Sequence, residues 1–339
     1  MQLIRKKAFA RAGLMGNPSD GYHGKTLSLV VRDFSAEVTL YEWDRVEVVF
    51  SRNDQTRFDS IDALVRDVRL HGYYGGIRLV KATIKKFVEF CRREGHLLHG
   101  RNFSARYESD IPRQVGLAGS SAIIVATLRC LMEFYGVEIP LPVQPSLVLS
   151  VETDELGIAA GLQDRVVQTY EGLVYMDFAR EVVHERCGLQ CGVYEPMDPG
   201  LLPPLYVAYS TELSEPTEVI HNNLRTRFQQ GEKAVVEAMQ RFGELTVEAR
   251  EAILARDEKR LGELIDANFD LRRSICRLPE GQIKMIETAR RAGATAKFAG
   301  SGGAIIGTYG DEATLERLKT DLGQIGCRVI RPRIVETEP

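Results

Sequence analysis

The sequence predicts an α+β protein with a strand-rich first half and a helix-rich second half. Three observations carry this prediction. Apolar and β-branched residues dominate positions 26–50, as in strands, and helix-forming residues run through positions 216–276. Positions 295–334 then pass through a strand, a glycine turn, a strand, a helix and a last strand, which predicts a ferredoxin-like β-β-α-β unit at the end of the chain.

The length of 339 residues allows two domains at about 150 residues each. We place the change from one domain to the other near residues 185–205. The expected units are an N-terminal domain over 1–190, which carries a phosphate-binding loop, and a C-terminal domain over 200–339.

The expected elements of the N-terminal domain follow from hydrophobic spacing and from turn residues. The segments TLSLVV, AEVTLYEW and VEVVF, separated by short charged turns within 26–50, are typical of antiparallel strands. Apolar residues at helical spacing, β-branched runs and glycine stops then predict a helix at 77–91, a strand at 102–107, a helix at 120–135 ended by Gly136, helical stretches at 146–155 and 163–170, and a strand at 173–178.

The C-terminal domain is expected to begin with a strand at 205–210. Between Pro216 and Cys276, the glycines Gly231, Gly243 and Gly262 predict that the run is divided or bent into three or more helices. The closing unit is expected as strands at 295–298, 304–309 and 327–334, a helix at 312–322, and a turn that contains Gly300, Gly302 and Gly303.

Charge and hydropathy exclude several classes of protein. The chain has 44 Lys and Arg against 47 Asp and Glu, a net charge of −3, so no basic face for nucleic acid dominates it. No apolar run approaches the roughly 20 residues that cross a bilayer. We therefore expect a cytoplasmic protein with a small-molecule partner and with no nucleic-acid or membrane partner, in an oligomeric state that the sequence leaves open.

The segment PRQVGLAGSSAII, which starts at Pro112, carries the strongest chemical signal. Its glycines and serines stand directly before a helix, where free backbone N–H groups and the helix dipole bind anions. A serine hydroxyl there is also suited to a Mg²⁺ ion carried by the phosphates. Taken alone, the segment is equally compatible with a plain turn and helix cap. The candidate phosphate-binding residues are Pro112, Gly116, Leu117, Ala118, Gly119, Ser120, Ser121 and Ala122.

This segment resembles the second signature of the GHMP kinase superfamily, and two further segments resemble the other signatures in the same order. These are ARAGLMGNPSDGY at 10–22 and KFAGSGGA at 297–304. Within the superfamily the chain is similar to the glucuronokinase branch, which phosphorylates glucuronic acid at C1. The stretches that carry this similarity lie at 74–79, 102–103, 111–123, 157–166, 172–178, 194–198 and 268–273.

The resemblance implies roles for four residues. Asp164 falls on the catalytic aspartate, Glu152 falls on the metal-ligating glutamate, and Ser121 is the second metal ligand. Arg11 is expected to keep Asp164 ionised and to share the charge of the transferring phosphoryl group. Without the resemblance, Glu152 is compatible with a solvated helix residue and Arg11 with a surface cation.

The substrate is expected to lie against Asp20, Gly21, Tyr22 and Arg165 and against the glycine turn of Gly300, Ser301, Gly302 and Gly303. A uronic acid needs a cation for its carboxylate, for which Lys25, Arg165, Arg272 and Arg273 are candidates. Trp43 is a candidate for stacking on adenine, although core packing is the more ordinary role of a lone tryptophan. His23 and His221 are weaker candidates for assisting groups.

These expectations combine into a magnesium-dependent sugar-1-kinase that converts ATP and D-glucuronate into ADP and glucuronate 1-phosphate. One alternative is a kinase of the same superfamily for another sugar or sugar acid, such as galacturonate, galactose or arabinose. The other is a nucleotide-binding protein without turnover, against which the presence of both Asp164 and Glu152 argues.

Overall fold

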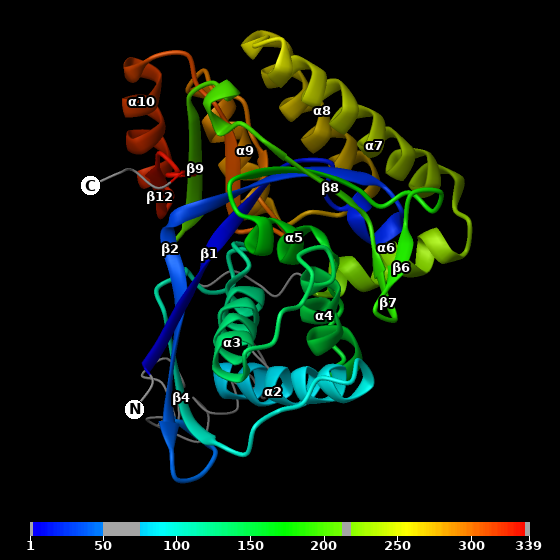
Figure 1. Cartoon of the computed structure of the whole chain (residues 1–339). Coiled ribbons are helices and arrows are strands. Elements are labelled where there is room, and N and C mark those ends of the chain that lie inside the picture. The colour runs from blue at the N-terminus through cyan, green and yellow to red at the C-terminus, as the bar shows by residue number, and fades with distance from the viewer. Residues whose placement is uncertain (1–2, 50–74, 212–217, 336–339) are drawn as a thin grey trace, which may run out of the picture.

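The computed structural model describes residues 3–49, 75–211 and 218–335. Phe50, Tyr74 and Pro216, which begin or end segments discussed above, lie outside these residues, as does the side chain of His221. In the described chain, the first half contains both strands and helices, and long helices dominate the second half before the final strands (Figure 1). The α+β class predicted from the sequence is confirmed.

The first sheet has six strands and belongs to the N-terminal half. Its order is β3-β4-β2-β5-β8, and β1 pairs with β2 off this path. The strands are β1 (Leu3–Met15), β2 (Lys25–Trp43), β3 (Glu47–Val49), β4 (Asn102–Ser109), β5 (Leu173–Asp177) and β8 (Val193–Met197).

β2 corrects the strand assignment made from the sequence. TLSLVV and AEVTLYEW were predicted as separate strands, but both lie in this one strand of 19 residues. The charged segment between them forms a bulge, because Ala10 of β1 pairs with Val31 while Phe9 pairs with Ser35. The third segment forms β3, which pairs with β4 in parallel and not in an antiparallel hairpin with β2.

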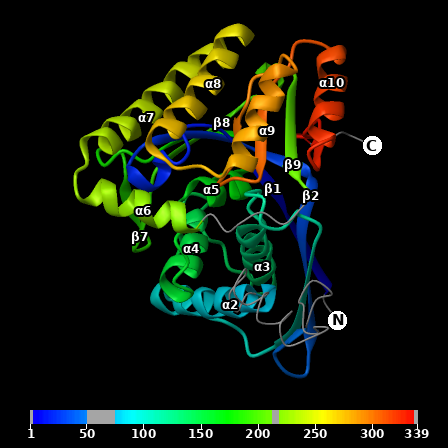
Figure 2. The same cartoon turned by 180° about the vertical axis from the view of Figure 1, so that it is seen from behind.

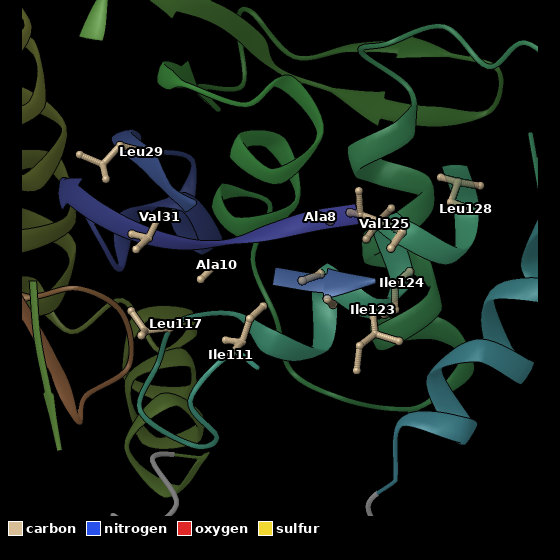
Figure 3. Close-up of a cluster of buried hydrophobic side chains, with 14 of the residues drawn as sticks. Ala8, Ala10, Leu29, Val31, Ile111, Leu117, Ile123, Ile124, Val125 and Leu128 are labelled. Atoms are coloured by element: carbon tan, nitrogen blue, oxygen red, sulfur yellow. The ribbon is translucent and has the colours of Figure 1, made fainter. Parts of the chain in front are cut away.

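Helical segments of the N-terminal half lie beside this sheet, and those at 119–135 and 163–170 pack directly against it (Figures 1 and 2). The helical segments are α2 (Gly76–Arg93), α3 (Gly119–Tyr135), α4 (Gln144–Ser150), the π-helical turn η2 (Val151–Glu155) and α5 (Gln163–Tyr170). Figure 3 shows Ala8 of β1 beside Val125 of α3, where the small side chain admits the helix close to the strand. Gly136 ends α3 in the left-handed conformation, as predicted.

A second sheet of four strands closes the C-terminal half. The strands are β9 (Leu205–Ser210), β10 (Lys297–Phe298), β11 (Ala304–Thr308) and β12 (Cys327–Ile330), all antiparallel to their neighbours in the order β10-β11-β9-β12. α9 (Glu280–Arg291) and α10 (Glu312–Gly323) pack beside it. The ferredoxin-like prediction is confirmed, with β9 as the first strand of a full β-α-β-β-α-β unit.

The remaining helices are α6 (Glu218–Gln229), α7 (Lys233–Leu254) and α8 (Glu258–Ile275). Gly231 separates α6 from α7, as predicted, with a φ of +72°. Three helices are present in the described part of this run, as predicted, but a division at Gly243 and Gly262 is wrong, because these glycines lie inside α7 and α8. A Cβ on Gly262 would come within 3.0 Å of Thr295 Cγ2, so this glycine lets α8 lie close to its neighbour and does not end the helix. Helix α9 was not predicted.

Smaller elements complete the described chain. They are η1 (Ser19–Tyr22), the hairpin of β6 (His184–Arg186) and β7 (Leu189–Cys191), and η3 (Pro199–Leu201). The two sheets meet where β1 ends: the N–H of Gly13 donates to the carbonyl of Ala299 at 2.7 Å. β8 belongs to the first sheet and β9 to the second, and the domain limits at 190 and 200 stay a prediction.

The backbone approach at Gly307 in β11 generates a stability prediction. A Cβ at this position would lie 1.7 Å from the carbonyl oxygen of Thr295. That contact is with backbone, which cannot rotate away, so Gly307→Ala is expected to destabilise the fold by about 3 kcal/mol or more. Gly310→Ala is the matched control, because nothing lies within 4 Å of its added Cβ. Urea denaturation measures both variants, and equal midpoints would contradict the prediction.

Candidate active site

Five charged side chains predicted as site residues converge where the two sheets meet. They come from β1, η1, η2 and the first turn of α5, and they are Arg11, Asp20, Glu152, Asp164 and Arg165. The three carboxylates and two guanidinium groups act on one another electrostatically, so they form a single cluster of charges.

Arg11 connects this cluster to both glycine-containing loops. Its Nε donates to Asp164 Oδ1 at 2.6 Å, and its Nη1 donates to the carbonyls of Gly116 and Ala299. The residue is only 6% exposed, so it is no surface cation of the neighbouring basic run. One guanidinium group therefore fixes the predicted catalytic carboxylate relative to the predicted phosphate-binding loop.

Arg165 lies between the carboxylates of Glu152 in η2 and Asp164 in α5. Its Nε donates to Glu152 Oε2 at 2.7 Å and its Nη1 donates to the carbonyl of Gly161 at 2.8 Å. Nη1 also lies 3.3 Å from Asp164 Oδ2. Burial raises the pKa of the Glu152 carboxyl, and the facing Arg165 charge opposes that shift. Glu152 is thus a buried, paired carboxylate and not a solvated helix residue.

Asp20 of η1 faces the segment that precedes α5. The backbone N–H of Gln163 donates to Asp20 Oδ2 at 3.2 Å, and a Cβ on Gly161 would come within 2.0 Å of the same oxygen. A glycine is therefore needed at position 161 for this carboxylate to fit. Burial, reinforced by the charge of Asp164, raises the pKa of Asp20 to about 6.

The loop before α3 has its carbonyl oxygens bound by the protein. Those of Gly116 and Leu117 accept from the side chain and the backbone N–H of Arg11, and that of Ala118 accepts from Gln168 Nε2 at 2.9 Å. Gly116 and Ala118 have positive φ values of 73° and 61°. Within the described chain, no backbone N–H of residues 116–121 donates a hydrogen bond to another protein group.

This backbone arrangement is that of an anion-binding nest at a helix N-terminus. Carbonyl groups turn toward the protein and N–H groups remain available, to which Ser120 and Ser121 add hydroxyls. Pro112 precedes the loop and Ala122 is buried in the first turn of α3. The glycines and serines of the sequence were enough to predict this loop. Nothing in the sequence indicated that Gln168 binds one of its carbonyl groups.

The glycine turn at 300–303 also has carbonyl oxygens that are bound by an arginine. Arg272 of α8 donates to the carbonyls of Gly300 and Ser301 at 2.8 and 3.1 Å. The turn lies directly on the phosphate-binding loop, because a Cβ on Gly116 would come within 2.8 Å of the Gly302 carbonyl oxygen. The two predicted loops therefore form one continuous backbone surface.

Lys297 is a buried lysine that sequence reasoning placed in a motif but gave no role. Its Nζ donates to the carbonyls of Gly13 and Phe298, at 2.6 and 2.8 Å, and to Asn17 Oδ1. Burial, with the charges of Arg272 and Arg11, lowers its pKa well below the ordinary value. The lysine joins the end of β1 to β10 beneath the site.

The basic residues proposed for a substrate carboxylate all have protein partners. Lys25 forms an ion pair with Asp177, Arg165 and Arg272 have the contacts given above, and Arg273 lies 3.3 Å from Glu287 on the surface. Their contacts do not single out one of the four, and the choice among them stays a prediction.

Trp43 has neither of the roles considered for it. Its 43% exposure rules out core packing, and its ring lies edge-on against Tyr41. Val30 is the partner of Arg11 in β2, and Trp43 lies 13 residues farther along this strand, roughly 40 Å away. Adenine stacking next to the phosphate-binding loop is therefore wrong for this residue. His23 adopts the left-handed conformation that ends η1.

The donor chemistry near the cluster fits a magnesium ion that phosphate oxygens and water also coordinate. Within the described residues, no group of three His, Cys, Asp or Glu side chains is arranged to hold a metal. Mg²⁺ in phosphoryl-transfer enzymes commonly takes only one or two protein oxygens. The Ser121 hydroxyl and the Glu152 carboxylate are oxygen donors of that kind.

Comparison with known proteins identifies the class. Residues 78–172 match the family described as GHMP kinases N terminal domain, and residues 249–326 match GHMP kinases C terminal. The solved structure of a Lin0012 protein from Listeria innocua covers 99% of this chain and 98% of its own, with a TM-score of 0.79 and 15% identity. The galactose complex of Lactococcus lactis galactokinase covers 98% and 94%, with a TM-score of 0.77 and 16% identity.

The nearer relatives in sequence are plant proteins. Glucuronokinase 1 of Arabidopsis thaliana is 44% identical over 310 residues, which are 89% of this chain and 84% of the relative. Probable glucuronokinase 2 of the same organism is 44% identical over 312 residues, or 90% and 84%. The chain therefore belongs to the GHMP kinases, which are phosphotransferases, as the three signatures predicted. No helix in its described segments is long and apolar enough to cross a membrane.

The raised pKa of Asp20 predicts a pH-dependent effect on stability. A carboxyl group with a pKa of about 6 in the folded state holds its proton to higher pH than in the unfolded chain, so stability falls as the pH rises from about 4 to 6. Asp20→Asn cannot ionise. It should unfold at higher urea than the parent at pH 7.5, by on the order of 2 kcal/mol, and this gain should shrink at pH 4.5. A gain independent of pH would contradict the assigned cause.

Proposed function

We propose that the chain transfers the γ-phosphoryl group of ATP to the C1 hydroxyl of D-glucuronate. One observation carries the proposal: the same buried guanidinium group holds Asp164 and the loop whose free N–H groups suit a phosphate. The 44% identity to glucuronokinase 1 supports the choice of sugar. The runner-up is a kinase of this family for galacturonate, galactose or arabinose.

In the proposed reaction, Asp164 accepts the proton of the C1 hydroxyl, or orients it, as that oxygen bonds to the γ-phosphorus. The bond from the γ-phosphorus to the oxygen of the leaving ADP breaks. N–H groups of the 116–121 loop bind the phosphates, and Arg11 stabilises charge on the transferring group while it holds Asp164 in place. Mg²⁺, held by Ser121 and Glu152, would neutralise phosphate charge.

Asp20, with Gly21 and Tyr22, is proposed to contact the sugar hydroxyls from η1. The turn of Gly300, Ser301, Gly302 and Gly303 is proposed to close over the substrate beside the phosphate-binding loop, which it already contacts. Arg165 is assigned a different task from the one expected, because its bonds to Glu152 and Gly161 hold η2 and α5 together.

The assignment of Asp164 is tested by replacing it with asparagine. Asn keeps an oxygen that accepts from Arg11 Nε but removes the charge and the basicity. Asp164→Asn should therefore leave the affinity for MgATP within about threefold and lower turnover about a hundredfold or more. Calorimetry measures the first quantity and a coupled ADP assay the second.

The matched control for this variant is Asp154→Asn. Asp154 is an exposed carboxylate of η2, 3.9 Å from Lys86, and its replacement should leave turnover near that of the parent. Ordinary turnover in Asp164→Asn would remove the residue from the mechanism. Lost MgATP binding would instead make it part of the nucleotide site.

The choice of sugar is tested by comparing glucuronate, galacturonate and glucose as acceptors. A site built for a uronate places a cation against the carboxylate, and an acceptor without that group leaves the cation unpaired. We expect kcat/KM for glucuronate to exceed that for glucose by at least about a hundredfold. Equal values would reject the uronate and leave the kinase assignment standing, and a preference for galacturonate would select the runner-up.

A further inference from the structure

The side of the site formed by η1 and α6 holds a basic residue that sequence reasoning did not single out. The ring of Tyr22 lies 4.8 Å from that of Phe228, so η1 rests on α6. Arg225 lies three residues before Phe228, on the same face of the helix. It is exposed, and no hydrogen bond or ion pair joins it to the described part of the protein.

Arg225 also shares an electrostatic neighbourhood with the site. Burial raises the pKa of the Tyr22 phenol to about 12; the charge of Arg225 opposes that shift, and the charge of Asp20 adds to it. Asp20 and Arg225 thus both lie close enough to act on one phenol. Asp20 belongs to the acidic cluster around Asp164, so Tyr22 connects that cluster to the face of α6 that carries Phe228 and Arg225.

The charges of the cluster explain why an anionic sugar needs such a residue. Asp20, Glu152 and Asp164 supply three carboxylates against the guanidinium groups of Arg11 and Arg165. A substrate carboxylate placed among these groups is repelled unless a further cation faces it. Lys25 and Arg273 are paired with acidic residues, and Arg272 is bound to the carbonyls of the glycine turn.

We propose that Arg225 is the specificity-determining residue that binds the C6 carboxylate of the sugar acid, an inference that rests on the function proposed above. Its planar guanidinium can form two parallel hydrogen bonds to a carboxylate. The helix that carries it is fixed two residues later, where Arg227 Nη1 donates to the carbonyl of Ile275 at 2.6 Å and Nε donates to Glu232 at 2.7 Å. The side chain is free for a ligand while its backbone is anchored.

Arg225→Gln tests this proposal, with Arg225→Lys and Lys233→Gln beside it. Lys233 is a matched cation at the start of α7, 3.7 Å from Glu237 and 88% exposed at its side chain. We expect Arg225→Gln to lower the ratio of kcat/KM for glucuronate to that for glucose at least about thirtyfold, chiefly through KM for glucuronate. Arg225→Lys should restore part of the ratio, and Lys233→Gln should not change it.

The assay on glucose reports folding, because that activity and KM for ATP should stay at the parent level in every variant. A parent enzyme that prefers glucuronate, together with an Arg225→Gln variant that prefers it equally, overturns the role of Arg225 and leaves the proposed function intact. A loss of preference in Arg273→Gln, with Arg225→Gln unaffected, also overturns it. A parent enzyme without any preference for glucuronate contradicts the proposed function and this inference together.

Discussion

The hydrogen bonds of Arg11 are the constraint on which the site depends. Its partners Asp164, Gly116 and Ala299 are 153, 105 and 288 residues away in the sequence. A buried guanidinium left without partners costs several kcal/mol, so folding favours the arrangement in which β1, α5, the phosphate-binding loop and the segment before the glycine turn meet around it. The contacts that place the proposed base against the proposed phosphate site are thus also contacts that hold the two sheets together.

Arg272 binds the glycine turn at 300–303 in the way that Arg11 binds the loop before α3. Each arginine donates to carbonyl oxygens of one loop, and each loop has N–H groups that donate to no other group in the described part of the protein. Among the described residues, the hydrogen-bond partners of the Arg272 guanidinium are carbonyl oxygens, and none is a carboxylate. Positive charge therefore lies behind both loops, which favours an anion in front of them and matches the polarity that phosphoryl transfer requires.

The sequence predicted what local chemistry determines. The glycine loop before α3, the helix ended by Gly136 and the strand at 205–210 follow from spacing and turn residues, and the structure contains all three, while the phosphate-binding role of the loop stays a prediction. The single strand β2 was not predicted, because its continuity through the bulge comes from pairing with β1, which the pattern of residues 26–50 does not contain. The glycines inside α7 and α8 misled for the same reason: what they contact comes from other parts of the chain. The partners of Arg165 and Arg272 also depend on tertiary contacts, so charge alone suggested both as ligands for a substrate.

Asp20 shows why such a site persists although it weakens the fold. Burial and the charge of Asp164 disfavour its ionised form, so at neutral pH the carboxylate destabilises the folded protein, and one backbone N–H offsets only part of this. A neutral side chain of the same shape would be more stable but would accept fewer hydrogen bonds from sugar hydroxyls. The acidic cluster that results would repel a uronate. Recognition of an acidic sugar therefore calls for a cation outside the buried network, on an element such as α6 that the cluster does not already bind, and this places the determinant of acceptor choice apart from the groups that carry out the transfer.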